Sequence, residues 1–183
     1  MKQNSIEIDN MIFDKYISNE EIKDRLSSLC EELNSYYKNK EPMVIGVLNG
    51  CIYFMMDMLD SCTFSYTIDF IKAKSYKGMK SDKLSVDYFL SDADFKNKDI
   101  LIVEDIIDSG KTMKHIYNKI KNCQPNDLKV ITLLTKVEKI SKDIEIDWSA
   151  FEIENKFVIG YGLDYNNLFR NLKDIYKLNE KEK

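Results

Sequence analysis

The chain has 183 residues and a net charge of −4, with 44% hydrophobic and 32% charged residues. This composition excludes a wholly disordered chain, and the length fits a single domain over residues 1–183. The acidic balance argues against nucleic acid as a partner, and no apolar run reaches the roughly 20 residues of a membrane-spanning helix. Because the chain begins without a basic-then-apolar leader, we expect it in the cytoplasm, with no membrane partner.

A helix is the first element that the sequence predicts, over residues 18–38. Ser18 and Glu21 form a capping-box pattern, and the apolar residues behind them recur at helical spacing. Pro42 then precedes a short apolar run over residues 43–48, which predicts a buried strand, and residues 51–60 are expected to form a helix packed on it.

Alternating residues over 64–70 predict a half-buried strand. The lysine-rich stretch 72–83 is expected to be a mobile loop or the end of a hairpin, with residues 84–90 as its returning strand. Two further apolar runs, 100–103 and 130–134, flank a helical pattern. Strand, helix and strand in this order predict a parallel sheet, whose ligands bind at the carboxyl ends of its strands.

Histidine and cysteine offer little chemistry. The four cysteines show no C-x-x-C pair, and His115 is the single histidine. Acid–base chemistry is therefore expected from carboxylates and lysines.

The most informative segment reads LIVEDIIDSGKT, residues 101–112. A buried strand brings Glu104 and Asp105 to its end, and a loop with Asp108, Ser109 and Gly110 opens a helix. Such a helix start suits a phosphate, and the paired acids suit sugar hydroxyls or a hydrated magnesium ion. The segment therefore predicts a sugar-phosphate site.

This segment has two other interpretations. Its final Gly-Lys-Thr resembles the end of a Walker A loop, but that loop requires glycine where Asp105 stands. A structural alternative is an ordinary helix with Asp108 or Ser109 as its N-cap.

Residues 103–112 resemble the 5-phosphoribosyl-1-pyrophosphate (PRPP) motif of type I phosphoribosyltransferases, and three further blocks narrow the resemblance to hypoxanthine-guanine members. The resemblance runs from about residue 44 to 172. It implies an α/β fold with a central, mostly parallel sheet flanked by helices. A small hood from the N- and C-terminal segments and a flexible lid loop over about residues 71–94, with Ser75 and Tyr76, are also implied.

In this family, the block at residues 47–50 binds pyrophosphate through backbone N–H groups, with a cis peptide bond that would fall at Leu48–Asn49. The family usually has lysine or arginine where Asn49 stands, so at this position the resemblance implies backbone contacts only. The block at 133–136 implies that Lys136 donates to the 6-oxo group of a purine.

The block at 156–170 implies that Phe157 stacks on the purine and that the Val158 backbone reads its edge. The same block implies that Asp164 holds magnesium through water and that Arg170 binds pyrophosphate. Arg170 is one of two arginines among 27 basic residues, and its planar fork suits phosphate oxygens. A surface salt bridge is the alternative interpretation of Arg170.

The resemblance thus implies magnesium-dependent transfer of phosphoribosyl from PRPP to hypoxanthine or guanine, with Asp108 as general base. The implied contacts to phosphoribosyl are Glu104, Asp105, Ile107, Asp108, Ser109, Gly110, Lys111 and Thr112; to pyrophosphate Leu48, Asn49, Gly50 and Arg170; to purine Lys136, Phe157, Val158 and Asp164; and to Mg²⁺ Glu104, Asp105 and Asp164. A homodimer or homotetramer is also implied. Two alternatives stay open: a xanthine- or adenine-directed enzyme, and a nucleic-acid-binding regulator that keeps the fold as a sensor.

Overall fold

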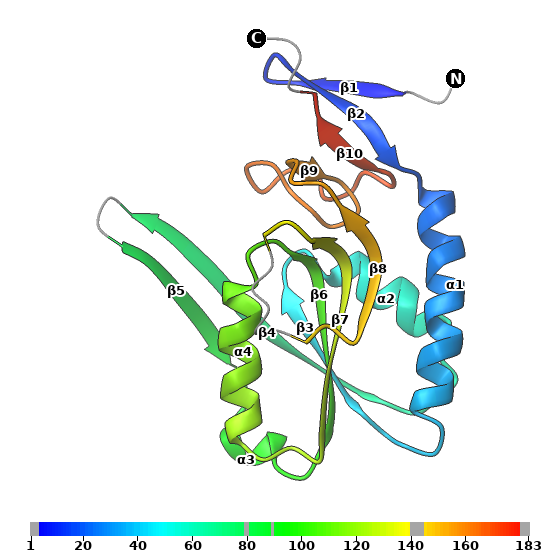
Figure 1. The fold of residues 1–183 in the computed structure, drawn as a ribbon, viewed down its shortest axis with the longest axis vertical. Helices are drawn as coiled ribbons and strands as arrows, with labels where there is room; N and C mark the ends of the chain where they lie inside the picture. Colours follow the sequence, from blue (N-terminus) through cyan, green and yellow to red (C-terminus); the bar gives the residue numbers. More distant parts are fainter. Residues whose placement is uncertain (1–3, 79–80, 89, 140–144, 180–183) are drawn as a thin grey trace.

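The computed structural model describes residues 4–78, 81–88, 90–139 and 145–179 (Figure 1). Its elements in chain order are β1 (Ser5–Ile8), β2 (Met11–Ile17), α1 (Asn19–Tyr36), β3 (Met43–Leu48), α2 (Ile52–Asp60), β4 (Thr67–Gly78), β5 (Ser81–Tyr88), α3 (Asp92–Phe95), β6 (Asp99–Ile107), α4 (Lys111–Asn122), β7 (Asp127–Lys136), β8 (Trp148–Ile153), β9 (Val158–Ile159) and β10 (Ile175–Leu178).

The core is a six-stranded sheet in the order β5-β4-β3-β6-β7-β8. All neighbouring strands pair in parallel except β4 and β5, which are antiparallel. The predicted parallel sheet is therefore confirmed. Because β3, β6 and β7 run in the same direction, the loops that follow them meet at one edge.

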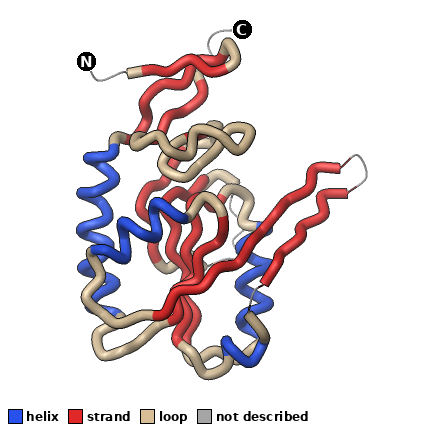
Figure 2. Tube along the Cα trace, turned by 180° about the vertical axis from the view of Figure 1, so that it is seen from behind, coloured by secondary structure: helices blue, strands red, loops and turns tan. Residues whose placement is uncertain are grey.

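Helices cover both faces of this sheet (Figures 1 and 2). Alternate residues of β6 point to opposite faces: Leu101 and Val103 belong to the cluster with α1 and α2, whereas Ile100 and Ile102 belong to the cluster with α4. All four are fully buried. This double-sided burial explains why β6 is a continuous apolar run in the sequence.

The capping box at the start of α1 is present as predicted. The Ser18 hydroxyl accepts a hydrogen bond from the backbone N–H of Glu21, and the Glu21 carboxylate accepts one from the backbone N–H of Ser18. These bonds satisfy donors that a helix start otherwise leaves unpaired. The predicted helix is therefore confirmed.

Strands β4 and β5 form a long hairpin that projects from the sheet (Figures 1 and 2). The sequence leaves open whether residues 72–83 form a loop or a hairpin end, and the structure shows paired strands. The strand predicted to begin at residue 64 begins at Thr67 instead, because the pairing of β3 with β4 starts at Met43 and Thr67. Residues 79, 80 and 89 lie outside the described part of the chain.

Both ends of the chain contribute to a second, antiparallel sheet in the order β1-β2-β10-β9, which we call the hood. Its core contains Phe13, Ile159 and Tyr176. The hood lies beyond one end of the six-stranded sheet (Figure 1). Among the described helices, none has the length and apolar character needed to cross a membrane.

Candidate active site

A pocket opens at the carboxyl ends of β3 and β6. Its lining comes from the end of β3 and the loop after it, from β4, from the end of β6, from the start of α4 and from the segment between β9 and β10. The lining residues are Val47, Leu48, Asn49, Gly50, Ala73, Glu104, Asp105, Ile106, Thr112, Asp164 and Arg170. An adjoining pocket shares three of them and is lined by Glu104, Ile106, Ile107, Asp108, Ser109, Gly110, Lys111, Thr112 and Met113. Two strand ends and two distant loops thus meet in one place.

Two acidic side chains lie at the floor of this site. Glu104 is only 8% exposed, and Asp105 is partly buried beside it. Burial, together with the neighbouring Asp105 carboxylate, raises the pKa of Glu104 well above its ordinary value. A cation or hydrogen-bond donor that enters the pocket would favour the charged form of this pair.

Helix α4 begins without a side-chain cap. Its N-cap is Gly110, at a positive φ of 75°, and within the described part of the chain no side chain caps the helix by a hydrogen bond. The alternative with Asp108 or Ser109 as N-cap is therefore wrong, because the tight turn needs the left-handed backbone that glycine adopts readily. The uncapped start, next to Ser109 and Thr112, lines the second pocket and suits an anion.

The loop after β3 lies directly against the acidic pair. The Leu48–Asn49 peptide bond is cis, as the resemblance implies. A Cβ placed on Gly50 would lie 1.6 Å from Asp105 Oδ2, so a larger residue at this position would displace the Asp105 carboxylate. Asn49, which follows the cis bond, is exposed. The structure therefore brings Gly50, an implied pyrophosphate residue, next to Asp105, an implied ribose residue.

Arg170 forms an ion pair and a hydrogen bond with two residues that precede it in the chain. Its Nη2 lies 2.7 Å from Asp164 Oδ1, and its Nη1 donates to the backbone carbonyl of Gly162 at 2.7 Å. Both side chains of the ion pair are partly buried and line the first pocket. Arg170 thus makes a salt bridge, but one at the pocket rather than on the open surface.

Asp108 lies between two lysines. Lys136 Nζ lies 3.3 Å from Asp108 Oδ2, and Lys139 Nζ lies 3.4 Å from Asp108 Oδ1. Lys136 is 7% exposed at the end of β7, whereas the Lys139 side chain is 43% exposed. The sequence does not single out Lys139, because a lysine after a strand end is by default solvated.

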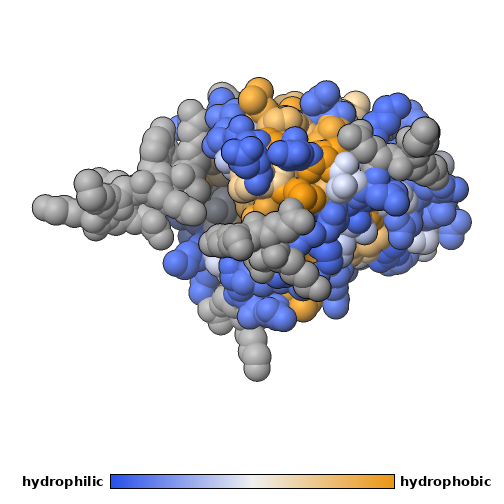
Figure 3. Space-filling model, turned by 90° about the horizontal axis from the view of Figure 1, so that it is seen from above, coloured by the Kyte–Doolittle hydropathy of each residue, from blue (hydrophilic) through white to orange (hydrophobic). Residues whose placement is uncertain are grey.

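Two other residues that the resemblance assigns to the purine, Phe157 and Val158, differ in exposure. Phe157 is 44% exposed, and its ring contacts Phe13 and Tyr165 with centroids 6.3 and 6.1 Å apart. Val158 is buried in β9. The face that carries the hood shows hydrophobic side chains gathered between hydrophilic ones (Figure 3).

Some of the implied residues do not line either pocket, namely Lys136, Phe157 and Val158. Ser75 and Tyr76 lie in β4, opposite Leu84 and Lys83 of β5. Among the described residues, no group of three His, Cys, Asp or Glu side chains could by itself enclose a metal ion.

Comparison with known proteins gives consistent matches. A family model described as a phosphoribosyl transferase domain matches residues 14–166. The hypoxanthine-guanine-xanthine phosphoribosyltransferase of Tritrichomonas foetus is 38% identical over 163 residues, which cover 88% of each chain. The hypoxanthine-guanine phosphoribosyltransferase of Lactococcus lactis is 37% identical over 166 residues, 90% of each chain.

Among solved structures, a hypoxanthine phosphoribosyltransferase from Staphylococcus aureus aligns with a TM-score of 0.83 and 33% identity, covering 91% of both chains. These matches confirm the fold class that the sequence motifs implied.

Proposed function

The chain belongs to the phosphoribosyl transferase family, and from this membership we propose that it is a purine-salvage enzyme. It transfers 5-phosphoribosyl from PRPP to N9 of hypoxanthine or guanine and releases pyrophosphate, giving IMP or GMP. The observation that carries the proposal is the single site formed by the loop after β3, the Glu104–Asp105 pair, the start of α4 and Arg170.

The start of α4 binds the 5′-phosphate of PRPP. Its uncapped first turn and the hydroxyls of Ser109 and Thr112 supply donors, with Ile107, Asp108, Gly110 and Lys111 completing the loop. Glu104 and Asp105 accept hydrogen bonds from the vicinal ribose hydroxyls. Arg170 and the backbone of Leu48, Asn49 and Gly50 bind the pyrophosphate group.

The donor set fits magnesium. Glu104, Asp105 and Asp164 line one pocket, and their carboxylates are the hard oxygen ligands that Mg²⁺ prefers. Because Mg²⁺ usually binds through one or two carboxylates plus water and substrate phosphates, a complete protein cage is not required. The bound ion would offset the charge that develops on pyrophosphate as it leaves.

The purine lies against Phe157, with its edge at the Val158 backbone and Asp164. Lys136 donates to the 6-oxo group, and Asp108 accepts the N7 proton while N9 attacks the ribose carbon. The 3.3 Å contact between Lys136 and Asp108 supports this pairing of roles, because it places both groups where one purine can reach them.

The β4–β5 hairpin is proposed as the lid, with Ser75 and Tyr76 in its first strand. Its projection beyond the sheet edge supports this role (Figure 1). A lid that closes over PRPP excludes water from the cation-like ribose during transfer.

A homodimer or homotetramer is the proposed assembly. The outer face of α2 supports it, because Ile52, Tyr53 and Met56 are between 42% and 51% exposed there. The cytoplasmic location, and the exclusion of nucleic acid and membranes as partners, remain predictions from the sequence.

Product formation from PRPP and Mg²⁺ with hypoxanthine, guanine, xanthine, adenine and uracil tests the proposed function. We expect turnover with hypoxanthine and guanine, weak turnover with xanthine and none with adenine or uracil. The name of the Tritrichomonas foetus relative includes xanthine, so the xanthine arm is the most informative comparison. Turnover restricted to adenine, or no turnover with any base, would contradict the proposal.

A further inference from the structure

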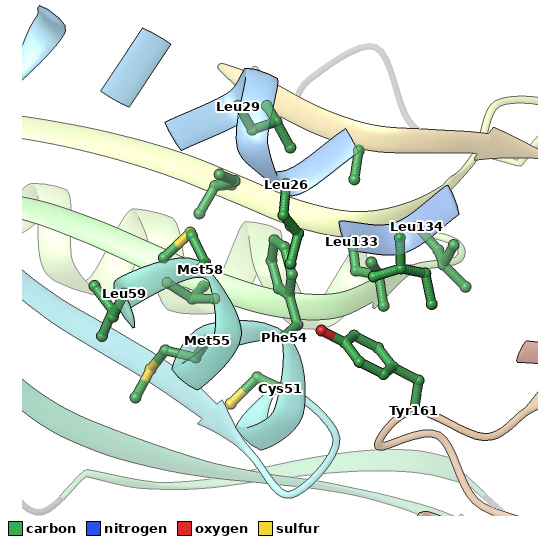
Figure 4. Packing of buried hydrophobic residues seen from close by; sticks show 14 of the residues in the cluster. Leu26, Leu29, Cys51, Phe54, Met55, Met58, Leu59, Leu133, Leu134 and Tyr161 are labelled. Carbon is green, nitrogen blue, oxygen red and sulfur yellow. The ribbon is translucent and has the colours of Figure 1, made fainter. Parts of the chain in front are cut away.

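Tyr161 has an unusual position for a residue in a surface turn. It is 2% exposed and has a positive φ of 50°. Its backbone N–H donates to the Leu172 carbonyl at 2.7 Å, which fixes the turn to the segment after Arg170. Its ring extends toward helix α2, with the oxygen end directed toward Phe54 (Figure 4).

The phenol of Tyr161 ends at a hydrogen bond. Its hydroxyl donates to Asp57 Oδ2 at 2.7 Å, and Asp57 lies on α2. Burial, and then Asp57 itself, raises the pKa of Tyr161, so the phenol stays neutral and acts as the donor. A buried hydroxyl without a partner is costly, and Asp57 supplies that partner.

The turn that contains Tyr161 and Gly162 also meets the loop before α2 at the pocket. A Cβ placed on Gly162 would lie 2.0 Å from the Gly50 carbonyl oxygen, so the two backbones touch. The Gly162 carbonyl accepts the hydrogen bond from Arg170 Nη1, and its N–H donates to the Arg170 carbonyl at 2.9 Å. Gly162 therefore contacts both parts of the proposed pyrophosphate site.

We propose that Tyr161 and Asp57 are a positioning pair for pyrophosphate. Their hydrogen bond ties α2, which follows the 48–50 loop, to the turn that holds Arg170, and so sets the separation of the two halves of the site. Neither residue lines either pocket. The inference rests on the proposed function, because it assigns the pair to the PRPP and pyrophosphate half of that site.

A double-mutant cycle tests the pair with Tyr161→Phe, Asp57→Ala and the double variant. We expect each single variant to raise KM for PRPP, and for pyrophosphate in the reverse reaction, by about 5-fold, with KM for hypoxanthine unchanged within about 2-fold. The double variant should be no worse than either single one, since both remove the same bond. Asp57→Asn should keep KM for PRPP and pyrophosphate close to the wild-type values, because its amide oxygen still accepts the hydrogen bond from the phenol.

Tyr36→Phe is the matched control. It removes a similar bond, from the Tyr36 hydroxyl to Asp127 Oδ2 at 2.6 Å, at the opposite edge of the sheet. It should lower Tm as Tyr161→Phe does, while KM for PRPP and KM for pyrophosphate stay unchanged. Titration calorimetry of PRPP with Mg²⁺ gives a second measurement that does not require turnover.

Two results would overturn the inference while wild-type turnover stands. One is a lower Tm for Tyr161→Phe with unchanged KM for PRPP and pyrophosphate, and the other is Asp57→Asn as damaging as Asp57→Ala. If wild type binds PRPP without turnover, weaker PRPP binding by the variants supports the pair although the proposed function fails. A wild type that binds no PRPP overturns both.

Discussion

Asp108 is paired on both of its carboxylate oxygens, with Lys136 on one side and Lys139 on the other. If a purine binds the Lys136 ammonium as proposed, Asp108 keeps its ion pair with Lys139. Asp108 and Lys136 can be chosen from the sequence because each lies in a recognisable block. Lys139 and the Tyr161–Asp57 pair cannot, because their roles depend on distances between segments far apart in the chain.

Replacing Lys136 should change which purines react. An ammonium group only donates hydrogen bonds, so it satisfies a 6-oxo group and opposes the 6-amino group of adenine. Lys136→Gln, whose amide can accept as well as donate, should lower kcat/KM for hypoxanthine and narrow its preference over adenine. The measurement is kcat/KM for hypoxanthine, guanine, xanthine and adenine.

Lys139→Gln is the control, since Lys139 also contacts Asp108 but is half exposed. It should keep the wild-type order of purines. Adenine turnover that rivals hypoxanthine in the wild-type protein would show that Lys136 does not select the base.

Phe157→Ala should weaken purine binding selectively. The half-exposed ring offers a stacking face, and base stacking on an aromatic ring contributes roughly 1–3 kcal/mol. KM for hypoxanthine should therefore rise by about tenfold, with KM for PRPP almost unchanged. Leu168→Ala, which removes a side chain that is 61% exposed, should change neither value. An equal rise in both KM values would mean that Phe157 holds the loop rather than the base.

At the scale of elements, strong local patterns predicted α1, β3, α2, β6, α4 and β7. Each has a capping box, a helical repeat or an apolar run. The hood strands β1 and β2 have no such pattern, although their two-residue connection, Asp9-Asn10 at positive φ, is typical of a tight hairpin. Strand β9 has only two residues, and such a short element leaves no periodic pattern to detect.

Gly162→Ala tests the close approach of the Gly162 and Gly50 backbones. Its Cβ would meet the Gly50 carbonyl at 2.0 Å, at a φ of 99° that alanine rarely adopts. We expect a loss of about 1–3 kcal/mol in the free energy of unfolding, together with a higher KM for PRPP. Gly160→Ala is the control, because its Cβ would instead meet the Asp174 carbonyl at 2.2 Å. It should destabilise the fold with a smaller effect on KM, and an equal effect on KM would argue against a specific contact at Gly50.

At the scale of the whole molecule, the site exists because the hood lies over the carboxyl edge of the six-stranded sheet. Asp164 and Arg170 come from the segment between two hood strands, whereas Glu104 and Gly50 come from the core. The order of these residues along the chain can be read from the sequence. Their separation in space cannot, because it depends on how two sheets pack against each other.

The buried Glu104 makes stability depend on pH. Its pKa in the folded protein lies well above the ordinary 4.5, mainly because of burial, so the folded state binds this proton more tightly than the unfolded state. The free energy of unfolding therefore falls as pH rises from about 4.5 through the raised pKa. Glu104→Gln should raise Tm relative to wild type above this window and leave it almost unchanged below.

Glu154→Gln is the control, because the pKa of Glu154 is shifted in the opposite direction from that of Glu104. The ion pair with Lys177 lowers the pKa of Glu154, so its contribution is present above its ordinary pKa and lost as pH falls. This variant should not gain stability at high pH. If the difference in Tm between Glu104→Gln and wild type does not change with pH, the Glu104 carboxyl is not the source of the pH dependence.

The most direct test of the central claim is a rapid-quench measurement of IMP formation in a single turnover. Enzyme loaded with PRPP and Mg²⁺ is mixed with hypoxanthine, for wild type and for Asp108→Asn. We predict stoichiometric IMP and pyrophosphate from wild type, and a chemical step about 10²-fold slower in the variant with nearly unchanged PRPP affinity, because the general base is lost. A chemical step of equal rate in both proteins would remove Asp108 from the mechanism, and the absence of IMP from wild type would contradict the whole assignment.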